Sequence, residues 1–231
     1  MRRLGQLGVE SGWRCLEVGA GRGSIACWMA SRVGPAGSVV AADIDPRFLT
    51  EVSENVEVRK LDIRTQDIES ERYDLVHCRA LLMHLPDPAA VLARMIRALR
   101  PGGLLLAEEA DSGLVHYAGH PDASAVTELC NRTIDVARQA GFDGYFGRRL
   151  PGMLLASGLE LQSTEVDTRV ARHGELEYEW TRITMLEGVQ KMVAAGIFDD
   201  ADQALLESFF SSAGTIVTTH SMVAALGRKP A

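Results

Sequence analysis

Short apolar runs and amphipathic stretches alternate along the first half of the chain. Apolar runs of strand length occupy residues 14–18, 38–42, 56–61, 73–78 and 104–107. Helical spacing of apolar residues marks 24–33 and the stretch after Asp87-Pro88. Because strands that alternate with helices pair in parallel, this pattern predicts an α/β fold: a doubly wound sheet with helices on both faces.

After Glu109 the pattern changes to longer helices. Helical spacing covers residues 122–140, 150–156, 175–195 and 200–210, and β-like runs cover 159–170 and 215–226. A length of 231 residues with 46% hydrophobic content suits a single domain. We therefore expect one domain, 1–231, with a core over 10–112 and 147–231. Helical insertions at about 113–141 and 174–211 would form a cap over the substrate.

A glycine-rich turn stands between the first apolar run and the first helix. Glu17 is followed by Gly19, Gly21 and Gly23, and the helix begins at Ser24. Alternate glycines allow a sharp bend and close approach of a ligand to bare main chain. A dinucleotide-binding turn needs its third small residue one position later, where Ser24 stands. The spacing favours a ligand without a pyrophosphate, and an NAD(P)-linked oxidoreductase is the less favoured alternative.

Acidic residues end the next two strands. Asp43 comes about 20 residues after the glycine turn, where a carboxylate can accept hydrogen bonds from both ribose hydroxyls. Asp45-Pro46 has the pattern of a helix cap, which leaves Asp43 for the ligand. Asp62 can accept from an adenine amino group, and Ile63 can cover the ring. Ligands of open α/β sheets bind at this edge.

Six motifs in order resemble those of class I S-adenosylmethionine-dependent methyltransferases, small-molecule type, similar to quinone-biosynthesis methyltransferases. They begin at Glu17 (EVGAGRG), Asp43 (DIDP), Asp62 (DI), Tyr73 (YDLVHCR), Met83 (MHLPD) and Leu99 (LRPGGLLL). The resemblance implies a Rossmann-like, mostly parallel seven-stranded sheet with an antiparallel last strand. It also implies S-adenosylmethionine as cofactor, S-adenosylhomocysteine as product and a small-molecule acceptor.

The resemblance also assigns roles by position. Gly19, Ala20 and Gly21 should line the methionine and ribose parts of the cofactor. Asp43 should hold the ribose, Ile44 should pack against the adenine, and Asp62 and Ile63 should bind the adenine. The Cys78 carbonyl should face the methionine amino group, and Glu17 should organise the turn. These roles are what the family pattern implies at the matching positions.

The chain departs from the family before its first strand. Relatives carry one or more helices there that cover the cofactor, whereas about a dozen residues precede the first strand here. Either a lid is missing or another segment supplies it. This departure keeps open a second function, an S-adenosylmethionine-binding protein of the same fold without methyl transfer.

Methyl transfer is an in-line displacement, so a catalytic base is optional. His84 is the leading candidate, because a histidine after the fourth strand can act as a base near neutral pH; a packed histidine is the alternative. The other candidates are Glu108, Asp111, His116, Tyr117 and His120. For the last three, loop residues satisfied by water are the alternative. His77 is expected to be structural, and His220 has no clear role.

Aromatic side chains could form an apolar acceptor pocket. Trp180 belongs either to such a pocket or to the core of its helix. Phe142, Tyr145 and Phe146 surround Gly144 in a predicted loop. If these residues line the pocket, the acceptor is a flat or hydrophobic small molecule.

The charge and the cysteine content argue against several classes of protein and site. A net charge of −7 without a basic cluster disfavours nucleic-acid binding. The four scattered cysteines indicate buried thiols in a reducing compartment and no metal site. There is no signal-peptide pattern and no apolar run of the roughly 20 residues that span a bilayer. We expect a cytoplasmic protein without a membrane or nucleic-acid partner, and a homodimer is left open.

Overall fold

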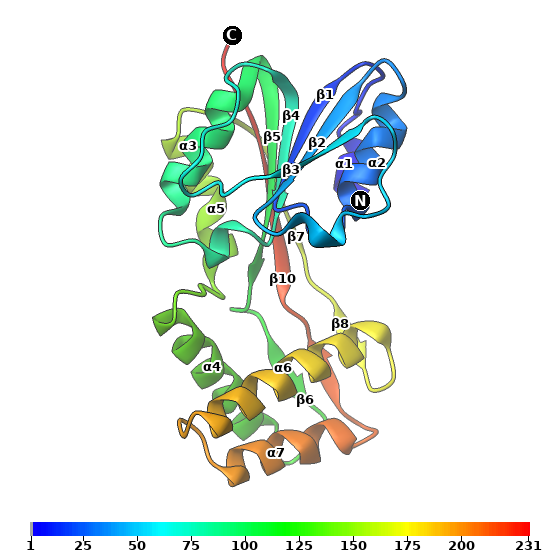
Figure 1. Cartoon of the computed structure of the whole chain (residues 1–231). Coiled ribbons are helices and arrows are strands. Elements are labelled where there is room, and N and C mark those ends of the chain that lie inside the picture. Colours follow the sequence, from blue (N-terminus) through cyan, green and yellow to red (C-terminus); the bar gives the residue numbers. More distant parts are fainter. Residues whose placement is uncertain (1) are drawn as a thin grey trace. The chain divides into compact units, whose positions relative to one another are not determined.

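A computed structural model describes residues 2–231 and divides the chain into two compact units (Figure 1). Unit 1 comprises residues 1–109, 149–165 and 224–231. Unit 2 comprises residues 110–148 and 166–223. The predicted helical insertions lie in unit 2, together with β-structure that the sequence pattern had placed in the core.

Unit 1 contains most of the seven-stranded sheet, in the order β3-β2-β1-β4-β5-β10-β7; residues 110–111, 166–167 and 221–223 of its strands belong to unit 2. Its strands are β1 (Arg14–Val18), β2 (Ser38–Asp43), β3 (Val56–Lys60), β4 (Tyr73–Arg79), β5 (Leu99–Asp111), β7 (Glu160–Asp167) and β10 (Ser221–Arg228). The pairs among β1 to β5 are parallel. The start of β5 bonds to the residue after β10, through Gly102 N–H to Lys229 O and Lys229 N–H to Gly103 O, so β10 is antiparallel. The predicted fold class is confirmed.

Helices cover both faces of this sheet (Figure 1). They are α1 (Arg2–Gln6), α2 (Ser24–Val33), α3 (Pro88–Ala98) and α5 (Leu150–Ala156), with the 3₁₀ turns η1 (Pro46–Phe48) and η2 (Leu82–His84). Buried residues of α1 and α2, among them Leu4 and Met29, pack on alternate strand residues such as Cys15 and Leu75. Because side chains alternate along a strand, the intervening residues face the opposite helices.

Helix starts in unit 1 follow the predicted caps only in part. Asp87 accepts from the Ala90 N–H at 3.0 Å, and Pro88 follows in the first turn of α3. Asp45 stands before η1, but its side chain makes no cap hydrogen bond and pairs instead with Arg47 at 2.7 Å. The predicted cap position of Asp45 and the short helix that begins at Pro46 are confirmed, but the capping hydrogen bond of the Asp45 side chain is absent.

Unit 2 combines helices with a small antiparallel sheet. Its elements are β6 (His116–Ala118), α4 (Ala123–Gln139), η3 (Phe146–Arg149), β8 (Val170–Arg172), α6 (Leu176–Ala194), α7 (Asp200–Ser211) and β9 (Ile216–Thr218). β9 pairs with both β6 and β8. The core is aromatic: the Tyr117 ring meets Phe209 edge-on at 5.4 Å, and Tyr178 meets Phe210 at 5.5 Å. Figure 1 shows α6 and α7 side by side.

Two predicted strands proved to be pairs of strands. Residues 215–226 divide into β9 and β10, and 159–170 divide into β7 and the start of β8. The alternation of buried residues continues from Val217 through Ser221 to Val223. The alternation of buried and half-buried residues is therefore continuous across Thr219–His220, although β9 belongs to the small sheet and β10 to the seven-stranded one. No helix among the described residues has the length and apolarity needed to cross a membrane.

Candidate active site

The glycine turn, Gly19–Gly23, leaves β1 with three positive φ angles. Gly19, Gly21 and Gly23 have φ of 73°, 57° and 78°. The N–H groups of Gly19 and Ala20 both donate to the Ala42 carbonyl, at 2.8 and 3.1 Å. A Cβ on Gly19 would lie 3.1 Å from Leu81 Cδ1, whereas one on Gly21 would meet nothing within 4 Å. The turn is closed beside Gly19 and open beside Gly21.

Asp43 holds the glycine turn from the end of β2. Its Oδ2 accepts from the Gly21 N–H at 2.8 Å, and its Oδ1 accepts from the Asp45 N–H at 2.9 Å. The sequence pattern predicted Asp43 as a ligand residue only, and its structural role in holding the turn was missed. The next side chain, Ile44, is 51% exposed, so it presents an apolar surface beside the carboxylate.

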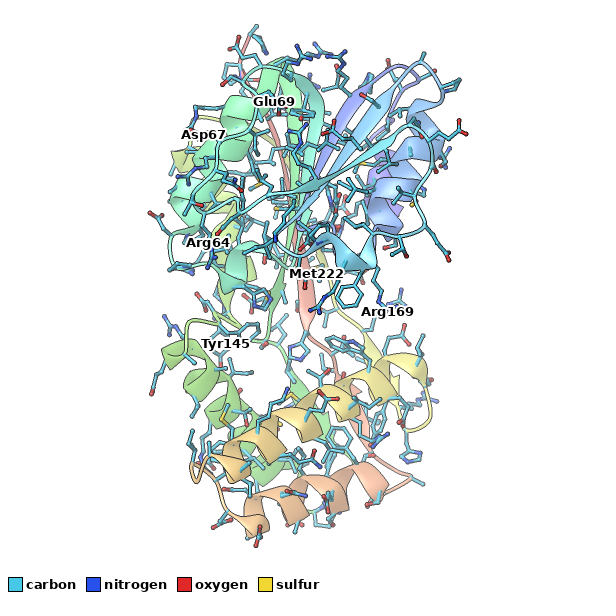
Figure 2. The ribbon with its side chains drawn as sticks, viewed as in Figure 1. Arg64, Asp67, Glu69, Tyr145, Arg169 and Met222 are labelled. Carbon is cyan, nitrogen blue, oxygen red and sulfur yellow. The ribbon has the colours of Figure 1, made fainter. Side chains whose placement is uncertain are left out.

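The third strand end is already occupied by a protein cation. Asp62 accepts from Arg64 Nε at 2.9 Å and from Arg64 Nη2 at 2.8 Å. The guanidinium lowers the pKa of this carboxyl below its usual range. Figure 2 labels Arg64 in the segment after β3. Ile63 is buried, and the Leu61 N–H, one residue before Asp62, donates to the Asp43 carbonyl at 2.9 Å.

The segment after β4 is held by a carboxylate that sequence reasoning missed. Glu109, at the end of β5, accepts from the N–H groups of Leu81, Leu82 and Met83 at 3.1, 2.8 and 3.3 Å. Burial raises the pKa of Glu109 to about 7, although these three hydrogen bonds oppose the shift. Glu109 therefore fixes the segment that places Leu81 over Gly19.

Two further features mark the same strand end. Cys78 is completely buried, and burial raises the pKa of its thiol well above the ordinary value, so the thiol is inert. Two residues on, Ala80 has a φ of 50°, a conformation that non-glycine residues rarely adopt. Such strain gathers at functional sites. His84 closes η2, and partial burial lowers its pKa.

A chain of buried charges runs across one face of the sheet. His77 Nδ1 lies 2.8 Å from Glu17 Oε2, and His77 Nε2 lies 3.3 Å from Glu108 Oε2. The other oxygen of Glu108 accepts from Arg3 Nη1 at 2.8 Å. The two carboxylates raise the pKa of His77 to about 9 against the effect of burial, and its partners lower the pKa of Glu108 to about 2. We call Arg3, Glu108, His77 and Glu17 the buried charge chain.

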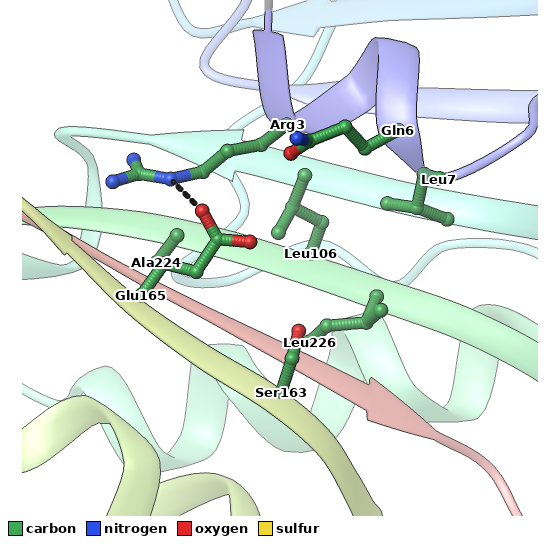
Figure 3. Close-up of a pocket in the computed structure, with 8 residues that line it drawn as sticks. All are labelled: Arg3, Gln6, Leu7, Leu106, Ser163, Glu165, Ala224 and Leu226. Carbon is green, nitrogen blue, oxygen red and sulfur yellow. Dashed lines mark ion pairs between the residues drawn. The ribbon is translucent and has the colours of Figure 1, made fainter.

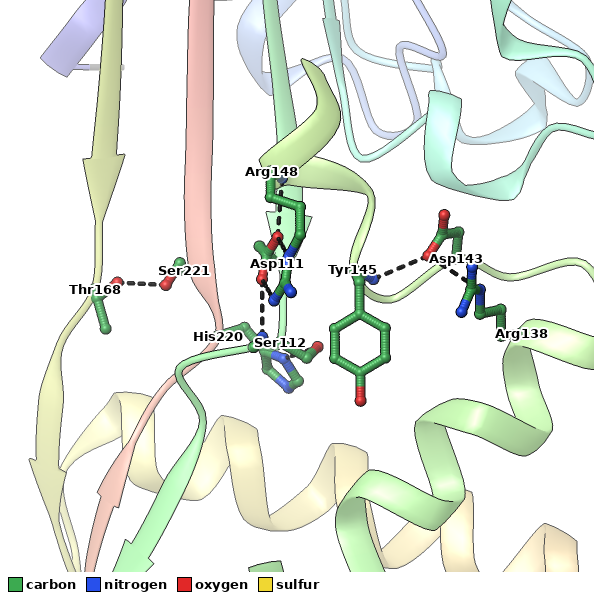
Figure 4. Close-up of polar contacts among 10 residues, drawn as sticks. Asp111, Ser112, Arg138, Asp143, Tyr145, Arg148, Thr168, His220 and Ser221 are labelled. Carbon is green, nitrogen blue, oxygen red and sulfur yellow. Dashed lines mark hydrogen bonds and ion pairs between the residues drawn. The ribbon is translucent and has the colours of Figure 1, made fainter. Parts of the chain in front are cut away.

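Glu108 and Asp111 are both held by cations and are poor bases. Asp111 accepts from Arg148 Nε at 2.8 Å and from Arg148 Nη2 at 2.7 Å (Figure 4). These bonds lower the pKa of Asp111. The same guanidinium lies 5.1 Å from the centre of the Tyr145 ring. Tyr145 is therefore held at the surface of unit 2 by a charged neighbour.

His220 proved to have a partner. Its Nδ1 lies 2.8 Å from Ser112 Oγ, and its ring meets that of Trp180 edge-on at 5.7 Å (Figure 4 shows the Ser112 pair). Burial lowers the pKa of His220, so its imidazole is neutral near pH 7. Trp180 is 57% exposed, which excludes the core alternative.

The remaining candidates divide between core and surface of unit 2. Tyr117 is buried in the aromatic core, and residues 116–118 form β6, so the predicted loop was wrong. His116 is exposed, and the His120 ring lies 5.8 Å from that of Phe209. Phe146 is buried and Phe142 is half-buried. The aromatic group around Gly144 is therefore not one continuous exposed surface.

The arrangement at the carboxyl ends of β1, β2 and β4 defines a class of protein. An open space beside Gly21, a carboxylate at Asp43 and an exposed Ile44 fit an adenosine ligand on bare main chain. The helix α2 begins after this turn with Gly23 at its N-cap position, so no capping side chain stands there. With the sheet order, these features are those of the class I S-adenosylmethionine-dependent methyltransferase fold.

Comparison with known proteins agrees with that class. Residues 16–107 match the family model described as "Methyltransferase domain". The resemblance seen in the motifs is confirmed.

Three relatives illustrate the match. The chain is 29% identical over 145 residues to methyltransferase str2 of Strobilurus tenacellus, covering 62% of this chain and 52% of that protein. It is 32% identical over 108 residues to the ubiquinone/menaquinone biosynthesis C-methyltransferase UbiE of Pseudomonas putida, covering 43% of this chain and 42% of that protein. A structure from Bacillus halodurans C-125, to which methyltransferase activity is attributed, has a TM-score of 0.67 at 19% identity and covers 100% of this chain and 98% of that one. The chain spans about half the length of the first two curated relatives.

Proposed function

We propose that this protein transfers a methyl group from S-adenosylmethionine to a small-molecule acceptor and releases S-adenosylhomocysteine. The observation that supports this most is the glycine turn, open beside Gly21 and held by Asp43. That geometry leaves main chain and a carboxylate for an adenosine ligand. The match of residues 16–107 to the family model described as "Methyltransferase domain" supports methyl transfer as the reaction.

In this proposal the residues of the turn bind and orient the cofactor. Gly19, Ala20 and Gly21 line its methionine and ribose parts, Asp43 accepts from the ribose, and Ile44 covers the adenine. When bound, the cofactor supplies a methyl group already activated by the positive sulfur. The protein then has only to align the acceptor and exclude water.

Three of the proposed cofactor contacts are weaker or use main-chain atoms: those of Asp62, Ile63 and Cys78. Asp62 has to share its carboxylate between Arg64 and the adenine amino group. Ile63 offers only the edge of a buried side chain. The Cys78 contact uses the carbonyl and not the thiol, so Cys78→Ala should be mild.

We propose that unit 2 is the cap that receives the acceptor. Its exposed side chains Leu176, Trp180 and Ile183 follow one another at helical spacing on α6. His220 lies against Trp180 and offers a neutral imidazole, and its Nε2 has no hydrogen-bond partner among the described residues. An apolar surface beside a polar anchor suits a flat small molecule that carries a hydrogen-bonding group. His84 remains the proposed base where the nucleophile has to lose a proton.

The protein is further proposed to act in the cytoplasm. The four thiols, Cys15, Cys27, Cys78 and Cys130, are all free cysteines, which suits a reducing compartment. The oligomeric state, with a homodimer as one alternative, is measured by light scattering of the purified protein.

An acceptor screen with release of S-adenosylhomocysteine as readout tests the proposal. Methylation of any small molecule, lost in Gly21→Val, is the expected result. Tight binding of S-adenosylhomocysteine with no turnover on any acceptor would favour the second function, a binding protein of this fold. Tight binding of NADH in a fluorescence titration, without binding of S-adenosylhomocysteine, would overturn both.

A further inference from the structure

The buried charge chain joins the first helix of the described chain to the strand that leads into the glycine turn. Arg3 lies in α1, Glu108 in β5, His77 in β4 and Glu17 in β1. Glu17 and His77 are direct cross-strand neighbours, and Val18 is paired with Cys78. Glu17 stands two residues before Gly19. The proposed function uses none of these four side chains to touch the cofactor.

The formal charges of the four residues in the buried charge chain balance. Two cations, Arg3 and His77, face two carboxylates, Glu17 and Glu108, and the side chains of all four are nine-tenths buried or more. Glu109 also senses the positive charge of His77. Removal of one partner from a buried ionic group leaves an uncompensated charge, which is costly. A change at Arg3 is therefore felt by Glu108, by His77 and in turn by Glu17.

Helix α1 depends on this chain for its position. A helix of five residues does not persist alone in water. Leu4 is its one fully buried apolar anchor among the residues 3–6, and Arg3 adds Glu108 and, at 3.5 Å, Glu165. A cavity of about 340 Å³ lies beside these contacts, between α1 and the strands β5, β7 and β10 (Figure 3). The ion pairs of Arg3 therefore add to the apolar contacts of Leu4 in holding α1.

We infer that docking of α1 and binding of the cofactor are linked through the buried charge chain, with His77 as a positioning residue for the glycine turn. This inference rests on the proposed function, because it takes S-adenosylhomocysteine as the ligand of that turn. The linkage works in both directions. Cofactor binding fixes the end of β1 and stabilises docked α1, and docked α1 favours the turn that binds the cofactor.

The test compares Arg3→Met with the wild type and with Arg97→Met. Arg97 lies in the same unit and makes an exposed ion pair with Asp67 at 3.0 Å, so it is a matched control for the loss of one guanidinium. S-adenosylhomocysteine should bind Arg3→Met at least about fivefold more weakly by calorimetry. Arg97→Met should bind it as the wild type does. In the wild type, the ligand should slow hydrogen exchange of the α1 amides.

A second measurement separates positioning from mere structural support. As the pH rises through about 9, His77 loses its proton, and the wild-type affinity for S-adenosylhomocysteine should fall. In His77→Gln the affinity should be lower and should not change over that range. This pH arm, with the exchange experiment on the wild type, also decides the question if Arg3→Met fails to fold.

The outcomes are distinct. A wild type that does not bind S-adenosylhomocysteine overturns the proposed function. A wild type that binds it, together with a folded Arg3→Met of equal affinity, overturns the linkage alone. An affinity of the wild type that is flat through about pH 9, with no change in α1 exchange, overturns it as well.

Discussion

The interiors of the two units differ in the kind of side chain that they enclose. Unit 1 encloses formal charges: the carboxylates of Glu17 and Glu108 lie in the interior and are paired with His77 and Arg3. Unit 2 encloses aromatic rings, and its charged pair Asp111–Arg148 has a guanidinium that is largely exposed. Its histidine with a lowered pKa, His220, is held by a hydroxyl.

This difference agrees with a division of work between the units. A rigid charged interior beside the glycine turn suits a fixed ligand, since buried ion pairs permit little variation in geometry. An aromatic core with an exposed apolar stripe suits a surface that can accept flat molecules of various shapes. The following predictions test that contrast, beginning with the largest effect.

Gly21→Val should abolish binding of S-adenosylhomocysteine. Valine at a φ of 57° strains the backbone, and its side chain enters the open space beside the turn. Gly141→Val in unit 2 is the matched control, because Gly141 also has a positive φ and open space around its Cβ. Calorimetry should show no binding by Gly21→Val and normal binding by Gly141→Val. Normal binding by both would mean that the turn is not the cofactor site.

Asp43→Ala should weaken binding of S-adenosylhomocysteine by about 1–3 kcal/mol, because the ribose hydroxyls and the Gly21 N–H all lose their acceptor. Asp45→Ala is its control, since that side chain makes no cap bond and its ion pair with Arg47 is solvent-exposed. Calorimetry measures both variants. An unchanged dissociation constant for Asp43→Ala would exclude the ribose contact.

The stability of the protein should fall by about 1–2 kcal/mol as the pH rises from about 7 to about 10. The pKa of His77 is raised to about 9, so its contribution is complete below the ordinary histidine pKa and is lost above the raised one. Glu109 has a pKa raised to about 7, so the stability that it costs is lost mostly as the pH rises toward 7, below this range, and then changes little. Urea midpoints should show the loss in the wild type and a flatter profile in His77→Gln. Equal slopes for both would remove His77 as the titrating group.

Trp180→Ala should change the unfolding free energy by no more than about 0.5 kcal/mol, because the side chain is more exposed than buried. If unit 2 receives the acceptor, the KM for that acceptor should rise about three- to tenfold. Ile197→Ala, a comparably exposed site in the same unit, is the control. Steady-state kinetics that show the same KM for both variants would remove Trp180 from the acceptor surface.

The sequence predicted unit 1 in detail because its signals are local. Buried parallel strands are short apolar runs, and Gly19, Gly21 and Gly23 stand where positive φ angles are required. The bounds of β1, α2 and α5 agree with the pattern residue for residue. Asp43 was found by its spacing from the turn, but its bonds to Gly21 and Asp45 were not, since they depend on how the turn folds back.

Contacts between distant residues could not be predicted in the same way. His77 lies 60 residues from Glu17, and His220 lies 108 residues from Ser112. Three-residue strands such as β6 bury too few side chains to leave a pattern. Glu108 and Glu109 are adjacent in one strand, so their side chains point to opposite faces of the sheet. Glu109 was missed because the sequence does not say which of the two faces each side chain occupies.

The position of β10 between β5 and β7 has a consequence for synthesis of the chain. Residues 224–231 belong to unit 1, yet the ribosome makes them after all of unit 2. Until they emerge, β5 and β7 lack the strand that joins them, and each exposes an unpaired edge. The nascent protein therefore has a gap in its main sheet after all of unit 2 has been made. A chain shortened by these few residues would keep that gap open, and aggregation is its expected fate.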